Sequence, residues 1–444
     1  MRRALLLVGV LAASTLSASA AQAESSGTPT PDDVEYVVEL SSNDDGTFWQ
    51  GEQTVSFRNT GDQALDTVWI RLWGNSRHGC GDDSRPQAAT ISDLSGGSLG
   101  DLEVDCTAAP IRLDRPAEPG ETSAVSFDVS IDVPEGAGRL GEVRGYVSVA
   151  SAIPLMSVLD ARGWHLPPAA EVESYYSLTS DFSVTLRHPS DLEIPAGGSA
   201  VDSRRDGDET VSTIDAPGVR DFAFAAGHFD KISAVSKDGV EVNLWYRDDV
   251  TEEQAREMSD WGVEAVDAFA EEYGAYPHPE LDLVHKGGME YPGIAWVYPT
   301  RDIVVHEVAH QWFYGLVGND QYAHPWMDEG LAQYAQTRLV DGDPDPCTDD
   351  PQWMSDAQRV DGGVDYYYPD HVDEYGPAVY VNASCMLHEL EATIGEDDMR
   401  KAMRLYVDRH AHDVAEPQEL REIFAEVSGR DLDAFWERWR NTAS

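Results

Sequence analysis

The pentapeptide His306-Glu307-Val308-Ala309-His310 constrains this chain most, because its chemistry requires a helix. On a helix, residues four positions apart lie on one face, so the imidazoles of His306 and His310 can reach one metal ion. Glu307 is rotated by roughly 100° from His306 about the helix axis. Its carboxylate can therefore act as a general base on a metal-activated water without binding the metal itself. The apolar residues that predict the helix are Ile303, Val304, Val308, Trp312 and Phe313, and its predicted end is Gly318.

A catalytic zinc ion needs a third protein ligand and one open position. Glu329 follows His310 after 18 intervening residues, enough for the chain to leave one helix and begin a second that faces it. Asp328 is the predicted N-cap of this second helix. The alternative pattern H-E-x-x-H-x-x-G-x-x-H is excluded, because Phe313 and Leu316 stand where it needs glycine and histidine. The two histidines and Glu329 therefore predict one zinc ion per chain.

The pattern of hydrophobic and polar residues changes near the middle of the chain. Residues 35–232 contain short alternating runs separated by Gly, Asp and Asn, which predict an antiparallel, all-β domain without helices. Residues 233–444 are predicted as a mainly helical α+β domain, whose first helix follows a capping box at Thr251-Glu252-Glu253-Gln254. A strand pair is predicted in this second domain at Leu281–Val284 and Ile294–Tyr298. The strands expected in the first domain include Glu52–Phe57, Asp66–Leu72, Ala124–Ile131, Phe182–Leu186 and Phe222–Ala226.

The N-terminus is typical of an exported protein. Arg2 and Arg3 precede a short apolar run, and Ala21-Gln22-Ala23 matches a signal-peptidase site. Residues 1–23 are therefore predicted as a signal peptide and residues 24–34 as a linker, which places the protein outside the cell or in the cell envelope. The apolar run is too short to span a bilayer, so no stable membrane insertion is expected.

Export suggests that the cysteines form disulfides, because they would then lie in an oxidising compartment. The natural pairing is Cys80 with Cys106 and Cys347 with Cys385, although four cysteines allow three connectivities. The net charge is −50, with 81 acidic residues against 31 lysines and arginines. Such a charge repels nucleic acid and anionic lipid, so these partners are excluded. The sequence predicts no oligomeric state.

Three motifs together resemble the M1 family of zinc aminopeptidases, the gluzincin group that includes aminopeptidase N and leukotriene A4 hydrolase. The first is His306 to His310 followed by Glu329-Gly330. The second is Gly287-Gly288-Met289-Glu290, which looks like the family's G-x-M-E-N exopeptidase motif, with Tyr291 where the family often has Asn. The third is Tyr380-Val381-Asn382-Ala383, which resembles the segment of the catalytic tyrosine.

The resemblance implies an N-terminal, saddle-like β domain packed on a thermolysin-like catalytic domain. It also implies that Tyr380 donates a hydrogen bond to the oxyanion of the transition state, with Tyr375 as the alternative tyrosine. Glu290 would bind the α-ammonium group of the substrate, and the backbone of Gly287, Gly288 and Met289 would align the peptide. The C-terminal helical domain of longer members is not expected in this sequence. The β domain of the family supplies a second amine-binding residue, for which the sequence offers only Trp164-His165, Glu171 and Glu173.

These features predict a zinc aminopeptidase that removes N-terminal residues from peptides with a free N-terminus. Two alternatives remain at this point. The same zinc site would serve an endopeptidase if Glu290 were only a surface acid, and a chain with this fold could be a non-catalytic peptide-binding module.

Overall fold

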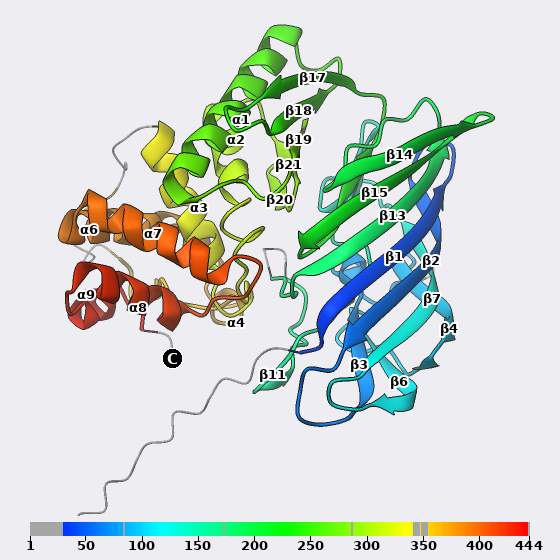
Figure 1. Ribbon diagram of the computed structural model, residues 1–444, viewed down its shortest axis with the longest axis horizontal. Helices are drawn as coiled ribbons and strands as arrows, with labels where there is room; N and C mark the ends of the chain where they lie inside the picture. The colour runs from blue at the N-terminus through cyan, green and yellow to red at the C-terminus, as the bar shows by residue number, and fades with distance from the viewer. Residues whose placement is uncertain are drawn as a thin grey trace, which may run out of the picture.

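The computed structural model describes residues 30–82, 85–170, 172, 174–285, 287–340, 347 and 354–442. The predicted signal peptide and most of the predicted linker lie outside the described residues, as do Glu171 and Glu173. The first half of the chain forms β-sheets, and the second half forms a mixed sheet with helices (Figure 1). The predicted fold class, a β domain followed by a mainly helical α+β domain, is confirmed.

A seven-stranded sheet dominates the first half, in the order β14-β15-β13-β1-β2-β7-β4. Its neighbours are antiparallel except β1 and β13, which pair in parallel, so the prediction of a purely antiparallel sheet was wrong at this position. The pairing joins segments far apart in sequence, which local patterns do not specify. The strands are β1 (Asp32–Ser42), β2 (Phe48–Arg58), β4 (Ala89–Ser95), β7 (Thr122–Asp132), β13 (Ser180–Pro189), β14 (Ser199–Asp206) and β15 (Glu209–Val219).

Smaller sheets pack against one face of this sheet. Their orders are β10-β3-β6-β5, β16-β9-β8 and β11-β12. Alternation along β1 buries Val34, Tyr36, Val38 and Leu40 in a core shared with Val68 and Ile70 of β3. One short 3₁₀ helix, η1 (Trp73–Asn75), interrupts the β structure, so the absence of helices was predicted wrongly there. The strands are β3 (Leu65–Arg71), β5 (Gly97–Leu99), β6 (Ala108–Ala117), β8 (Leu140–Val143), β9 (Tyr146–Val149), β10 (Leu155–Met156), β11 (Leu159–Asp160), β12 (Gly163–Trp164) and β16 (Phe224–Ala226).

A five-stranded sheet opens the second half, in the order β17-β18-β19-β21-β20. Strands β18, β19 and β21 run parallel, whereas β17 and β20 are antiparallel to their neighbours. The predicted pair of strands corresponds to β19 and β21. It is part of a larger sheet in which the short strand β20 lies at one edge. The strands are β17 (Asp230–Val235), β18 (Glu241–Tyr246), β19 (Glu280–His285), β20 (Met289–Tyr291) and β21 (Ile294–Val297).

Helices cover this sheet and fill the rest of the second half (Figure 1). The capping box at the start of α1 is confirmed, because the Thr251 side chain accepts from the Gln254 backbone and the Gln254 side chain accepts from the Thr251 backbone. The α-helices are α1 (Glu252–Tyr273), α2 (Arg301–Ala309), α3 (Trp326–Val340), α4 (Val364–Tyr367), α5 (Val372–Gly376), α6 (Ala383–Ile394), α7 (Glu396–His410), α8 (Pro417–Ser428) and α9 (Asp433–Arg438), with a π-helical segment η3 (Pro377–Asn382) between α5 and α6.

Helix α2 ends at Ala309 with His310 as its C-cap, so the predicted end at Gly318 was wrong. The reason is tertiary. The buried guanidinium of Arg220 donates to the backbone carbonyls of Tyr314 at 3.0 Å and Leu316 at 3.4 Å. The chain therefore folds back into a tight turn in which Gly315 N–H donates to the His310 carbonyl at 2.8 Å.

The predicted disulfides are present in the structure. Cys80 is bonded to Cys106 in the first half, and Cys347 is bonded to Cys385 at the start of α6. In the described part of the chain, no helix has the length and hydropathy needed to cross a membrane.

Candidate metal centre and active site

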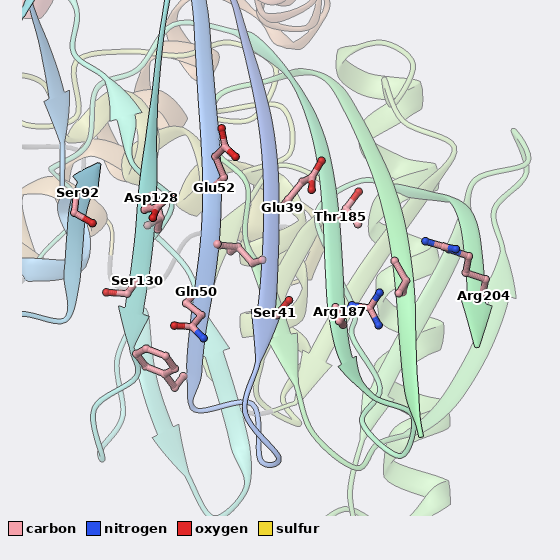
Figure 2. Close-up of a pocket in the computed structure, with 15 residues that line it drawn as sticks. Glu39, Ser41, Gln50, Glu52, Ser92, Asp128, Ser130, Thr185, Arg187 and Arg204 are labelled. Carbon is pink, nitrogen blue, oxygen red and sulfur yellow. The ribbon is translucent and has the colours of Figure 1, made fainter. Parts of the chain in front are cut away.

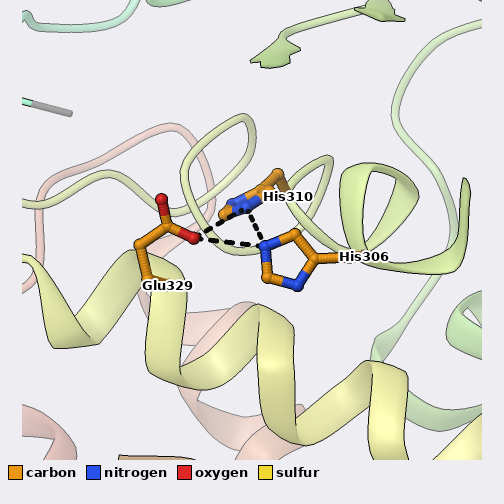
Figure 3. Close-up of side chains that lie close together, drawn as sticks. All are labelled: His306, His310 and Glu329. Atoms are coloured by element: carbon orange, nitrogen blue, oxygen red, sulfur yellow. Dashed lines mark hydrogen bonds and ion pairs between the residues drawn. The ribbon is translucent and has the colours of Figure 1, made fainter. Parts of the chain in front are cut away.

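Two facing helices bring the three predicted ligands together. His306 and His310 project from the end of α2, and Glu329 projects from the first turn of α3 (Figure 3). The Nε2 atoms of the histidines lie 3.1 Å apart. The Oε2 atom of Glu329 lies 3.2 Å from Nε2 of His306 and 3.4 Å from Nε2 of His310. All three residues are buried.

This arrangement fits a zinc ion. Tetrahedral coordination with bonds of about 2.0–2.1 Å places neighbouring ligand atoms roughly 3.3–3.4 Å apart. The three separations between the ligand atoms lie close to that value. Two imidazoles and one carboxylate are also the donor types that zinc binds, and three ligands leave the fourth position open, as a catalytic site requires.

A second carboxylate orients His310 from behind. The Oδ1 atom of Asp328 lies 2.6 Å from Nδ1 of His310, and its Oδ2 accepts a hydrogen bond of 2.6 Å from Gln321. Asp328 lies inside the first turn of α3, so its prediction as the N-cap was wrong. A metal-binding histidine usually donates its other ring nitrogen to such an acceptor, which fixes the ring and its tautomer. The sequence carried a signal for this, since Asp328 directly precedes the predicted ligand Glu329.

The charges of these groups depend on one another. Burial alone would lower the pKa of His310, but the carboxylates of Asp328 and Glu329 raise that pKa well above its ordinary value. Burial alone would raise the pKa of Glu329, yet the two histidines hold it well below its ordinary value. Glu329 is therefore an ionised, acceptor-only ligand at neutral pH.

The glycine-rich segment before β20 faces this centre. A Cβ atom on Gly288 would lie 3.5 Å from Oε1 of Glu307, so the general-base candidate points at this segment. A Cβ atom on Gly287 would lie only 2.7 Å from Cβ of Trp296, so glycine is required there by close packing. Glu290, on β20, is buried, and its carboxylate lies within 4.8 Å of ligand atoms of Glu307 and His310.

The β half contributes a residue that sequence reasoning missed. Nη2 of Arg139 donates to Oε1 of Glu290 at 2.9 Å, and the two side chains are 16% and 4% exposed. The Arg139 guanidinium lies 5.3 Å from the ring centroids of both Tyr175 and Tyr291. Tyr291, which stands where the family often has Asn, is itself tied to the β half by a 2.6 Å hydrogen bond between its hydroxyl and that of Ser151.

His165, by contrast, lies in another network. Its Nε2 atom is 2.8 Å from the buried carboxylate of Asp320, which links the two halves of the chain. Asp320 is not a predicted site residue, so this contact gives His165 a structural role. No local sequence signal marks Arg139, which lies 151 residues from Glu290.

Of the two candidate tyrosines, Tyr380 is the one in contact with a predicted ligand. Its hydroxyl donates to Oε1 of Glu329 at 2.6 Å, and its ring stacks on His306 with centroids 6.0 Å apart. It is carried by η3, and π-helical segments are frequent at functional sites. The Tyr375 ring packs against Tyr380 at 6.3 Å and lies one layer further from the ligands.

Two cavities flank the glycine-rich segment and share Gly138, Gly288 and Met289. One, of about 380 Å³, has a largely apolar lining and reaches the general-base candidate Glu307. Its aromatic residues are Tyr146, Phe229, Trp296 and Tyr298. We call it the aromatic cavity. The other, of about 370 Å³, has basic side chains in its wall; its lining includes Trp73, Arg77, His78, Arg139 and Tyr175. We call it the basic cavity.

A wider concavity of about 820 Å³ lies on the outer face of the seven-stranded sheet (Figure 2). Strand side chains such as Glu39, Glu52, Asp128 and Arg187 line it, and no predicted site residue does. Its acidic groups lie on the neighbouring strands β1, β2 and β7 and its arginines on β13 and β14, and such polar side chains are typical of the solvated face of a sheet. The metal centre and its two cavities are therefore the candidate active site.

Comparison with known proteins agrees with this geometry. Residues 295–439 match the family described as Peptidase family M1 domain. Aminopeptidase M1-D of Oryza sativa subsp. japonica is 24% identical over 306 residues, covering 59% of this chain and 34% of the relative. Puromycin-sensitive aminopeptidase of Caenorhabditis elegans is 25% identical over 309 residues, covering 61% of this chain and 31% of the relative. The chain thus spans about a third of the length of these relatives.

A solved structure shows the same fold over a similar length. The crystal structure of the M1 zinc metallopeptidase from Deinococcus radiodurans superposes with a TM-score of 0.65 and 16% identity, covering 94% of each chain. At that identity the likeness concerns the fold alone. We conclude that residues 295–439 match the peptidase family M1 domain and that the chain has the fold seen in an M1 zinc metallopeptidase.

Proposed function

We propose that this protein is a zinc-dependent aminopeptidase that hydrolyses the first peptide bond of peptides with a free N-terminus. One observation carries the proposal over other peptidase activities. The buried carboxylate of Glu290 lies within 4.8 Å of ligand atoms of both Glu307 and His310. A negative charge therefore stands directly beside the general-base candidate.

This spacing matches the chemistry of an N-terminal residue. The amino nitrogen and the carbonyl carbon of one residue are roughly 2.5 Å apart, as bond lengths and angles require. A carboxylate that holds the α-ammonium group must therefore lie within a few ångströms of the groups that act on the carbonyl. Glu290 meets this condition with respect to Glu307 and His310.

The protein groups would share the reaction as follows. A bound zinc ion supplies Lewis acidity, which polarises the carbonyl and makes water a stronger acid. Glu307 takes a proton from the attacking water and passes it to the leaving amine. Tyr380 turns its hydroxyl from Glu329 to the developing oxyanion, a contact typically worth about 3 kcal/mol. Glu290 fixes the α-ammonium group, and the Gly287–Gly288 backbone aligns the peptide like an added strand.

One zinc ion per chain is part of the proposal. Among the described residues, the two groups of side chains that could hold a metal share His310, so they form one site rather than two. Asp328 would keep His310 in the tautomer that presents Nε2 to the ion. Export through the predicted signal peptide is also proposed, and N-terminal sequencing of the mature protein would test it.

One experiment separates this function from the alternatives. Purified protein loaded with zinc is incubated with a single peptide, and the products are followed by mass spectrometry. Stepwise loss of one residue from the N-terminus, abolished by Glu307→Gln, supports the proposal, whereas internal cuts would indicate an endopeptidase. Absence of turnover despite one zinc per chain would favour a peptide-binding module.

A further inference from the structure

The amine-binding candidate already holds a cation. Arg139 of the β half pairs with Glu290 at 2.9 Å, and both side chains are largely shielded from water. The Arg139 guanidinium is held between the rings of Tyr175 and Tyr291, at 5.3 Å from each. Its backbone carbonyl accepts hydrogen bonds from Ser148 and from the backbone of Ala150, so the residue is anchored at both ends.

Arg139 also forms part of the wall of the basic cavity. Charged or titratable residues in that wall are Arg77, His78 and Arg139, and among the described residues that line it none is Asp or Glu. The nearby acid Asp221 offsets only part of the arginine charge, because burial raises the pKa of Asp221 to about 7.

The position of the basic cavity assigns it to the first residue of the substrate. The side chain of that residue leaves from the same carbon as the α-ammonium group. It must therefore enter the cavity whose wall touches Glu290, and Arg139 makes that contact. Glu307, which acts on the scissile bond, lines the aromatic cavity instead. That cavity therefore suits the substrate residue that follows the scissile bond.

Competition for Glu290 then favours one kind of first residue. When an α-ammonium group reaches Glu290, it competes with the Arg139 guanidinium for that carboxylate. A carboxylate on the first side chain can take over the displaced guanidinium, so the substrate zwitterion exchanges partners with the existing ion pair. A neutral first side chain brings no carboxylate for this exchange.

We propose that the basic cavity selects N-terminal glutamate and aspartate, with Arg139 as the residue that determines this specificity. The proposal rests on the aminopeptidase function given above and names its substrate class. Arg77 and His78, at the same wall, add positive potential at a greater distance from Glu290.

The test compares zinc-loaded protein on peptides that differ only in their first residue: Glu, Asp, Gln, Leu and Lys. We expect kcat/KM for Glu to exceed that for the isosteric Gln by roughly tenfold or more, and Lys to be the poorest. Binding of the Glu and Gln peptides to Glu307→Gln protein, measured by calorimetry, gives the same comparison without turnover.

Variants distinguish a change in substrate preference from a general loss of activity. Arg139→Gln should lower the Glu/Gln ratio of kcat/KM at least tenfold, because the carboxylate of an N-terminal Glu loses its cationic partner. Arg139→Lys should retain part of the ratio. Arg187→Gln is the matched control, because Arg187 pairs with Asp206 and Glu209 on the outer sheet face and should leave the ratio unchanged.

Each outcome decides a different point. A Glu preference that Arg139→Gln removes supports the proposal. Stepwise trimming with no preference for acidic residues, or a loss that affects all peptides equally in Arg139→Gln, overturns it and leaves the aminopeptidase function intact. Cleavage at internal bonds, or no cleavage of any of the five peptides, overturns both.

Discussion

Asp328 and His310 form a close contact behind the metal centre, with Oδ1 of the aspartate 2.6 Å from Nδ1 of the histidine. The aspartate is also held by Gln321, so its position is fixed from two sides. The contact holds the His310 ring with Nε2 directed at Glu329 and His306. The geometry of the site thus depends on a residue that binds neither metal nor substrate.

Asp328→Asn should weaken zinc binding by roughly 10- to 100-fold, because the acceptor that sets the His310 tautomer loses its charge. Competition with a chelating dye at neutral pH measures the affinity. Asp302→Asn is the control, since Asp302 is an exposed acid in the first turn of α2. An unchanged zinc affinity in Asp328→Asn would contradict the assigned role.

Tyr380→Phe should lower kcat by about 10²–10³ with little change in KM or zinc content, because the lost hydroxyl serves the oxyanion only in the transition state. Tyr375→Phe is the matched control, since its ring packs on Tyr380 without contacting a predicted ligand in the described contacts. A larger loss in Tyr375→Phe than in Tyr380→Phe would reverse the assignment.

Asp221→Asn should stabilise the protein increasingly as the pH rises. Burial raises the pKa of Asp221 to about 7, so the folded state binds this proton more tightly than the unfolded state does. The free energy of unfolding of the wild type then falls by roughly 1–4 kcal/mol between about pH 4 and pH 7, and Asp221→Asn does not show this fall. Urea denaturation of both proteins at pH 5 and pH 8 measures the difference. A gap between the two proteins that does not widen with pH would refute this account.

Added salt should raise the Tm. The net charge of −50 makes the folded chain repel itself. Raising the ionic strength from about 0.1 M to about 1 M shortens the screening length from about 10 Å to about 3 Å. Calorimetric scans in sodium chloride test this, and a Tm that is constant or falls would show that the charge is already compensated locally.

The features of the site that could be predicted are those that depend on the spacing of residues close together in the sequence. His306 and His310 are four residues apart on one helix, so the helix period alone brings them together. Glu329 follows after 18 intervening residues, enough for the chain to leave α2 and begin α3 opposite it. Asp328 was recognised as part of this segment, but an N-cap and a first-turn acid look alike in sequence.

What could not be predicted depends on contacts between distant segments. Arg139 reaches Glu290 across 151 residues, and no periodicity marks either as a partner of the other. The segment after α2 folds back instead of continuing the helix, and there the guanidinium of the distant Arg220 donates to the carbonyls of Tyr314 and Leu316. The parallel pairing of β1 with β13 likewise joins distant segments, whereas each strand by itself follows from its alternation.

The most direct measurement compares cleavage of one peptide with a free N-terminus and the same peptide with an acetylated N-terminus, by wild-type protein and by Glu290→Gln. Acetylation removes the ammonium group that Glu290 is proposed to hold, so we expect the wild type to trim only the free peptide. Glu290→Gln should lose most of this discrimination while retaining its zinc. Equal cleavage of both peptides by the wild type would contradict the aminopeptidase function.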